Sequence, residues 1–256
     1  MAVLKNAIEA LDPAPDKKTQ ITLALSLLSE LCEQKVSQFT QQIESELRTA
    51  GTIENRTIPV TEILATHTEY RAYIRDDAGK IAEEVTTAIK KFIAGTADSI
   101  LDGIASIVTT GITAIIGAGS GVQQEMRSYF VVVQGFSIVR FDIRIWCRQI
   151  EAEGITAKIE SALATAAYKS SVDIRKISLN TFLSTYQDQL VKIGIPESDW
   201  KSYLDTAEEM YERLKGEMNQ LGSEPPAPLL ATGGHFVGPA TLVGTPWKRA
   251  CRVFDS

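Results

Sequence analysis

The stretch GIASIVTTGITAIIGAGSGVQQ, Gly103–Gln124, contains no ionisable side chain, although 23% of the residues in the chain are charged. As an α-helix it would be about 33 Å long, close to the roughly 30 Å thickness of a bilayer's hydrocarbon core. Its apolar residues are mostly Ile, Val and Ala, and they are diluted by Gly, Thr and Ser. The stretch is therefore weakly apolar for a permanent membrane span and unusually apolar for one helix of a soluble protein.

Small side chains recur along this predicted helix at steps of four residues. Such rows allow two helix backbones to approach closely, as they do where helices associate in lipid. The residues expected at a close helix contact are Ala105, Thr109, Thr113, Gly117 and Gly121. The larger apolar residues, which we expect to enter a membrane, are Ile104, Ile107, Val108, Ile112, Ile115 and Ile116.

The same stretch also has part of a nucleotide-binding pattern, because Gly117-Ala118-Gly119 follows an apolar run. The dinucleotide fingerprint needs a third glycine for close helix–strand packing, and Val122 stands at that position. No further alternation of strands and helices follows along the chain. A doubly wound sheet is therefore not expected.

The apolar residues of 128–148 fit the periodicity of a helix and also that of a strand. Met126, Phe130 and Val133 continue into a helical row, whereas the alternation over Val139–Cys147 is typical of a strand. Tyr129–Val133, with the following Gln134-Gly135, also fits one arm and the turn of a hairpin. We favour a helix because the segments on both sides are expected to be helical, and the strand remains the alternative.

Four arginines follow the uncharged stretch: Arg127, Arg140, Arg144 and Arg148. On a helix the last three are four residues apart and share one face. They could contact anionic lipid headgroups when the apolar part is inserted. The alternative is a set of internal ion pairs with the acidic segments that precede them.

Long amphipathic segments flank the centre and predict the fold class. Apolar residues recur every three or four positions in each of them. The predicted helices run over about 17–50, 60–92, 155–193 and 198–221. These patterns predict an all-α fold, an elongated bundle of about five to six long helices around a central uncharged helix rich in small residues.

From Gly222 the chain becomes rich in proline and glycine, with Pro225, Pro226 and Pro228 close together. Such a segment cannot form a long helix. We expect a helical domain over residues 1–221, with its central apolar segment at 100–136, and an irregular tail over residues 222–256 that packs on it.

Composition excludes several classes of function. The net charge of −6 argues against nucleic acid as a partner, because phosphate binding needs a basic field. Cys32, Cys147 and Cys251 are an odd number of widely separated thiols, so neither a disulfide framework nor a metal site is expected. His67 and His235 belong to no catalytic or metal-binding motif. We therefore expect no cofactor and no metal, and we favour a function that is not enzymatic over the remaining alternative, an enzyme of unrecognised type.

The N-terminus has no Sec-type signal pattern, so we expect synthesis as a soluble cytoplasmic protein. In outline, the chain looks like α-helical pore-forming toxins, which shelter an apolar hairpin until they meet a membrane. The leading hypothesis is a protein of that kind, exported or injected by a non-Sec route, that oligomerises and inserts roughly residues 100–136. The alternative is a helical scaffold or self-assembling interaction protein whose central helix is simply core. Ile112→Asp distinguishes them, because it should unfold the protein only if Ile112 is core.

Overall fold

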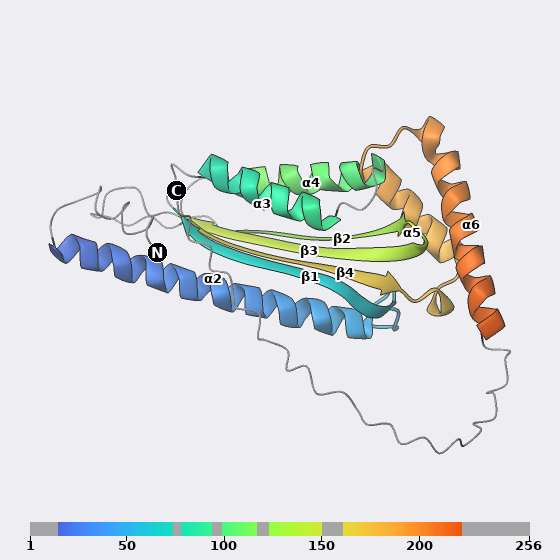
Figure 1. Ribbon diagram of the computed structural model, residues 1–256, viewed down its shortest axis with the longest axis horizontal. Helices are drawn as coiled ribbons and strands as arrows, with labels where there is room; N and C mark the ends of the chain where they lie inside the picture. The colour runs from blue at the N-terminus through green and yellow to red at the C-terminus, as the bar shows by residue number, and fades with distance from the viewer. Residues whose placement is uncertain (1–14, 74–77, 94–98, 117–122, 150–160, 222–256) are drawn as a thin grey trace, which may run out of the picture.

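The computed structural model describes residues 15–73, 78–93, 99–116, 123–149 and 161–221, which form an α/β fold (Figure 1). The predicted all-α bundle is wrong, because a four-stranded antiparallel sheet lies at the centre of the molecule. The elements are α2 (Pro15–Thr49), β1 (Val60–Tyr73), α3 (Ala78–Ile93), α4 (Ser99–Ile116), β2 (Gln123–Gln134), β3 (Ser137–Gln149), β4 (Ser161–Val172), the 3-10 turn η2 (Ile174–Lys176), α5 (Leu179–Lys192) and α6 (Glu197–Leu221).

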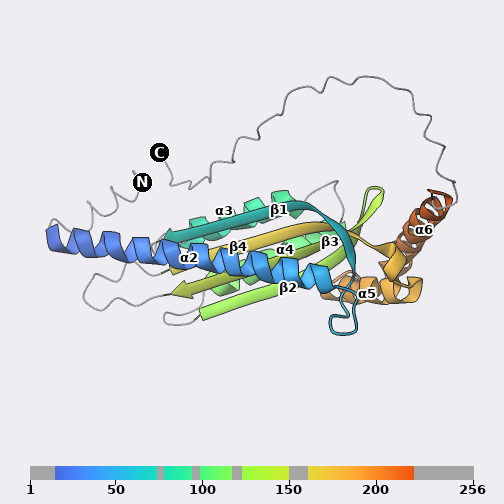
Figure 2. The ribbon, with the colours of Figure 1, turned by 90° about the horizontal axis from the view of Figure 1, so that it is seen from below.

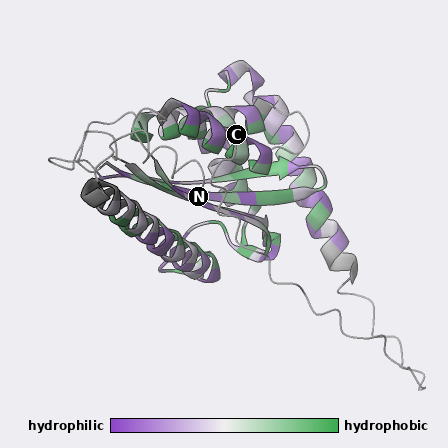
Figure 3. Cartoon of the chain, turned by 60° about the vertical axis from the view of Figure 1, so that its left-hand side comes forward, coloured by the Kyte–Doolittle hydropathy of each residue, from purple (hydrophilic) through white to green (hydrophobic). Residues whose placement is uncertain are grey.

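The strands lie in the order β1-β4-β3-β2, so β1 and β2 are the two edges of the sheet. α2 packs on one face, mainly over β1 and β4, and α3 and α4 cover the other face (Figures 1 and 2). α5 and α6 lie at one end of the sheet. Figure 3 shows hydrophobic and hydrophilic residues alternating along the helices, as expected for helices with one buried side.

The helix predicted over 128–148 is wrong, and the alternative hairpin is what forms. β2 and β3 pair from Gln123 with Arg148 to Gln134 with Ser137, and Gly135 at the turn has a φ of 60°. Glycine tolerates this left-handed conformation at no steric cost. β3 is an inner strand, so Phe141, Ile143 and Ile145 are buried under the α3–α4 layer while polar residues alternate with them on the α2 face.

Two other predicted helices are also partly strands. The one expected over 60–92 divides into the edge strand β1 and the helix α3, and the one expected over 155–193 divides into β4, η2 and α5. β1 and β4 pair with each other across about a hundred intervening residues, as in His67 opposite Ala167. Ser178 begins α5 by accepting a hydrogen bond from the backbone N–H of Thr181 (3.2 Å). The predicted tail, residues 222–256, lies outside the described residues.

The central helix α4 is one layer on the sheet rather than the axis of a bundle. Its inward side is buried, whereas Ser106, Thr110, Thr113 and Ala114 are exposed. Its closest approaches occur at two glycines. A Cβ at Gly111 would lie 2.3 Å from the sulfur of Met126 on β2, and one at Gly103 would lie 3.0 Å from the Cβ of Ile193. These glycines let α4 lie against β2 and the end of α5.

Among the described helices, none is both long enough and apolar enough to cross a membrane. The predicted membrane-inserting segment 100–136 is not one helix either, because it includes the strand β2. The description of the chain as an all-α pore-forming toxin is therefore wrong in its architecture and has no support in the structure.

Alanines on β4 determine how closely α2 can approach the sheet. Ala162, Ala164 and Ala166 are fully buried on the α2 face and form one core cluster with residues of α2. Leu28, Cys32, Phe39, Ile43 and Leu47 of α2 are also buried in this cluster. Because the alanines are small, the large side chains of α2 fill the space above them.

Enlarging one of these alanines is expected to overpack the interface. Ala164→Leu should lower the free energy of unfolding by about 1–3 kcal/mol, because the added atoms have no free volume beneath α2. Urea denaturation followed by circular dichroism measures this change. The matched control is Thr68→Leu on β1, an exposed position that points to the same face, for which we expect a change within about 0.5 kcal/mol. An equal effect of the two substitutions would contradict this account of the alanine row.

Candidate functional site

An open cleft of about 540 Å³ lies beside the edge strand β2, which α2 leaves uncovered (Figure 2). This volume lies in the range typical of ligand sites, roughly 300–1,000 Å³. Its lining combines three arginines with two carboxylates, one lysine, one tyrosine and several apolar residues. The lining residues are Glu46, Thr57, Ile107, Arg127, Ser128, Tyr129, Phe130, Arg140, Asp142, Ile143, Arg144 and Lys192.

Arg140 is the most deeply buried charged residue of the cleft, with 1% of its surface exposed. Its Nε and Nη2 donate to the two carboxylate oxygens of Asp142, at 2.9 and 2.7 Å. Its Nη1 donates to the carbonyl oxygen of Ile58 (2.7 Å) and to the hydroxyl of Thr57 (3.0 Å). The guanidinium also lies 4.6 Å from the centre of the Tyr129 ring. Arg140 therefore joins β3, β2 and the segment that leads into β1, and little of it is left to bind a ligand.

Arg140 holds the carboxylate of Asp142 in a buried environment that disfavours its negative charge. Burial raises the pKa of the Asp142 carboxyl above its usual range, and the hydrogen bonds and charge of Arg140 oppose that shift only in part. Glu46 of α2 adds a smaller upward contribution. Breaking the pair would therefore leave a costly buried carboxylate.

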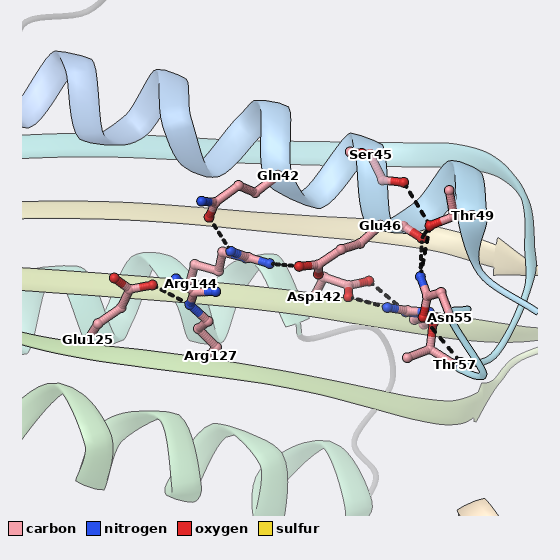
Figure 4. A network of polar contacts seen from close by, with 11 residues as sticks. Gln42, Ser45, Glu46, Thr49, Asn55, Thr57, Glu125, Arg127, Asp142 and Arg144 are labelled. Atoms are coloured by element: carbon pink, nitrogen blue, oxygen red, sulfur yellow. Dashed lines mark hydrogen bonds and ion pairs between the residues drawn. The ribbon is translucent and has the colours of Figure 1, made fainter. Parts of the chain in front are cut away.

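Arg144 links β3 to α2. Its guanidinium donates to the side chains of Gln42 and Glu46, which lie one turn apart on α2 (Figure 4). Only 5% of the Arg144 side chain is exposed, whereas 48% of the Glu46 side chain is exposed. This contact anchors α2 to β3.

Arg127 and Arg148 extend towards solvent. Arg127 pairs with Glu125 on the same strand, and Lys35 of α2 lies 3.1 Å from the other oxygen of Glu125 (Figure 4 shows the first pair). Burial alone would raise the pKa of Glu125, but Arg127 and Lys35 outweigh it and the pKa lies below its usual value. The Arg127 side chain is 55% exposed and Arg148 is also exposed.

All four predicted arginines share one face of the β2–β3 hairpin, the face towards α2, since Arg127 is paired with Arg144 and the others are an even number of residues apart. Arg144 forms an ion pair with Glu46 of α2, a preceding acidic segment as in the alternative to headgroup contact, whereas Arg140 pairs with Asp142 on its own strand. α4 lies on the opposite face, so joint membrane contact by these arginines and α4 is not compatible with the present arrangement. A headgroup role for the arginines stays a prediction.

The residues predicted to insert into a membrane lie mainly in the core of the α4 layer. Five of them are buried, namely Ile104, Val108, Ile112, Ile115 and Ile116, and Ile107 is half-buried. In the predicted small-residue row, Ala105 is buried, Thr109 half-buried and Thr113 exposed. The hydroxyls of Thr109 and Thr113 donate to carbonyls one turn earlier, at 2.7 and 2.9 Å. Gly117 and Gly121 lie outside the described residues.

Several residues of the cleft were not singled out by the sequence analysis, including Glu46 and Thr57. No local pattern marks them, since they come from α2 and from the segment after it and meet β3 only in the folded chain. The described lining of the cleft contains no histidine or cysteine. In the described part of the chain, no group of three His, Cys, Asp or Glu residues could hold a metal ion. The cationic and aromatic side chains of the cleft are suited to binding anions or peptide groups.

Comparison with known protein families, with curated proteins and with solved structures finds no match for this chain.

Proposed function

We propose that this protein binds anionic membrane surfaces, and that it does so by releasing the α3–α4 hairpin from the sheet so that the hairpin's apolar side meets the lipid. The observation that supports this proposal most is that α3 and α4 form a separate layer of the molecule. Its two helices pack extensively on each other and cover one face of the sheet (Figure 1).

α3 has the character of a helix that lies in a membrane interface. Its inward side consists of Ile81, Val85, Ile89 and Ile93, all buried, and its last turn carries Lys90 and Lys91. Helices with one strongly apolar side and lysines on the polar side bind in the plane of anionic bilayers. α3 and α4 would be about 24 and 27 Å long, which suits lying in the interface rather than crossing the bilayer.

α4 has no charged residue after Asp102, and its exposed side carries only small neutral residues. The inward side of α4, which would meet the lipid, is apolar, so its transfer to the interface would desolvate no charged group. The hydroxyls of Thr109 and Thr113 are already bonded within the helix. The hairpin is attached to the sheet largely by apolar contacts, supplemented by the Arg71–Glu84 ion pair and by a hydrogen bond from Gln134 to the carbonyl of Ile93 (3.4 Å).

A disulfide that ties α4 to α5 tests this proposal. Gly103 and Ile193 are suitable, because a Cβ at Gly103 would lie 3.0 Å from that of Ile193 and a small shift reaches the usual disulfide range of roughly 3.5–4.5 Å. In a Cys251→Ser background, reduced Gly103→Cys/Ile193→Cys should sediment with phosphatidylserine-containing vesicles as the wild type does. The oxidised form should lose most of that binding.

The two single-cysteine variants are the matched controls, and neither should respond to oxidation. Lys90→Glu/Lys91→Glu should also weaken binding, since each basic residue near an anionic surface contributes about 1 kcal/mol. Wild-type protein that does not bind these vesicles, or an oxidised form that binds as well as the reduced one, would refute the proposal.

A second candidate, a self-assembling interaction protein, is favoured by a different observation, the open edge of β2.

A further inference from the structure

β2 is an edge strand, and within the described residues no further strand pairs with its outer side. The backbone N–H of Val131 donates to the side-chain oxygen of Gln189 on α5 (2.6 Å). This N–H therefore points away from β3. In an antiparallel pair, the backbone groups of successive residues point alternately towards and away from the neighbouring strand. The β2–β3 register is uninterrupted, so the N–H and C=O groups of Glu125, Arg127 and Tyr129 also point outward.

Gln189 closes this edge at Val131 and leaves the part from Gln123 to Tyr129 available. The cleft lies beside this part, since its lining includes the consecutive residues Arg127, Ser128, Tyr129 and Phe130. Outward N–H and C=O groups beside an open cleft form a template for one more strand.

We propose that β2 pairs antiparallel with β2 of a second copy of this chain, about a two-fold axis through Met126. This register places Glu125 opposite the partner's Arg127, and Arg127 opposite the partner's Glu125. The two contacts are identical by symmetry, as a two-fold interface requires. Both residues have outward backbone groups, so they also form the hydrogen-bonded pairs of the new ladder.

Electrostatic interactions favour this register over the two neighbouring registers. Moving the axis to Arg127 would place the two Arg127 side chains opposite each other, and moving it to Glu125 would do the same with the two glutamates. Like charges directly opposite in a sheet are destabilising, whereas opposite charges contribute favourably. The axis at Met126 is the register in which both charged residues of this edge, Glu125 and Arg127, meet a partner of opposite charge.

The layers of the molecule permit this pairing. The two-fold axis of an antiparallel strand pair is perpendicular to the sheet, so α2 of both copies would lie on the same face. α2 lies mainly over β1 and β4, on the side of the sheet away from the β2 edge, and contacts β2 through the Lys35–Glu125 ion pair (Figure 2). The result would be one continuous eight-stranded sheet.

Complementary charge-reversal variants test the pairing in solution without lipid, so the result is independent of membrane binding. Glu125→Arg and Arg127→Glu should each be monomeric by sedimentation equilibrium at concentrations where the wild type is a dimer. An equimolar mixture of the two should form a dimer, because every pair across the axis is again of opposite charge. Arg148→Glu makes the same charge change on the same face of β3 and should leave the wild-type dimer intact.

A cysteine at the axis tests the register itself. In a Cys251→Ser background, Met126→Cys places two thiols across a non-hydrogen-bonded pair, with Cα atoms about 4.5 Å apart and within reach of a disulfide. Oxidation should yield a covalent dimer that reducing agent dissociates. Ser128→Cys, on the same face of β2, would place its thiols about 13 Å apart across the axis and should not cross-link. A monomeric wild type, a mixture that stays monomeric, or equal cross-linking at both positions would overturn the proposal.

Discussion

Replacing Arg140 with methionine is expected to lower the free energy of unfolding by about 3–5 kcal/mol at neutral pH. The substitution removes both donors to Asp142 while its carboxylate remains 6% exposed beneath α2. It also leaves the carbonyl oxygen of Ile58 without the hydrogen bond from Arg140. Denaturant unfolding followed by circular dichroism measures the change. Arg148→Met, at an exposed position of the same strand, should change stability by less than about 0.5 kcal/mol.

The loss of stability in Arg140→Met should be larger at neutral pH than at acidic pH. Burial already raises the folded-state pKa of Asp142 above its unfolded value, and removing Arg140 raises it further. A carboxyl with a raised folded-state pKa destabilises the protein where it is ionised, so its cost is largest above that pKa and disappears as the pH falls below the unfolded value. The deficit of Arg140→Met should therefore shrink between neutral pH and about pH 4. Arg140→Met/Asp142→Leu should regain most of the lost stability at neutral pH, and a double variant as unstable as the single one would contradict the role assigned to the pair.

Ile112→Asp is expected to leave the protein largely unfolded at 25 °C. Ile112 is 0% exposed and belongs to the main core cluster, where α4 meets the sheet. Replacing a large buried aliphatic side chain by a small one costs about 2–5 kcal/mol, and an unpaired buried carboxylate adds several more. The sum approaches the whole stability of an ordinary domain, roughly 5–15 kcal/mol. Far-UV circular dichroism and a thermal melt measure this outcome.

The adjacent Thr113→Asp is the matched control for Ile112→Asp. Thr113 is exposed, so the same carboxylate remains in water and should cost less than about 1 kcal/mol, mostly through its position near the C-terminal end of the helix. A folded Ile112→Asp variant would show that α4 is not required for the core. Because the folded form buries Ile112, loss of vesicle binding by this variant cannot by itself demonstrate insertion, whereas the disulfide between α4 and α5 separates the two effects.

The two ends of the described chain could be predicted closely from sequence. Helices expected over about 17–50 and 198–221 are observed at Pro15–Thr49 and Glu197–Leu221. Both have long uninterrupted rows of apolar residues at helical spacing, and Gly51 or Pro196 marks one end. A helix that buries one continuous apolar stripe can be predicted from its own sequence, whatever it packs against.

The strands could not be predicted in the same way. β4 has the sequence SALATAAYKSSV, whose alanines favour a helix in isolation, and it is extended here because α2 needs small residues beneath it. β1 is an edge strand with many exposed residues, so its buried pattern is weak. Their pairing joins segments about a hundred residues apart, and local periodicity carries no information about such a partner.

The arginines show which features the sequence determines by itself and which depend on the tertiary structure. A spacing of four puts side chains on one face of a helix and also on one face of a strand, so the shared face of Arg140, Arg144 and Arg148 was determined by the sequence alone although the predicted element was wrong. The sequence likewise determined that Gly103–Ile116 would be uncharged and would bury an apolar side. Tertiary structure alone decided that these residues cover a sheet, that Arg140 and Arg144 are neutralised by Asp142 and α2, and that the edge of β2 remains open. The reason is physical: side-chain periodicity is a local property, whereas strand pairing and charge neutralisation depend on groups brought together only by folding.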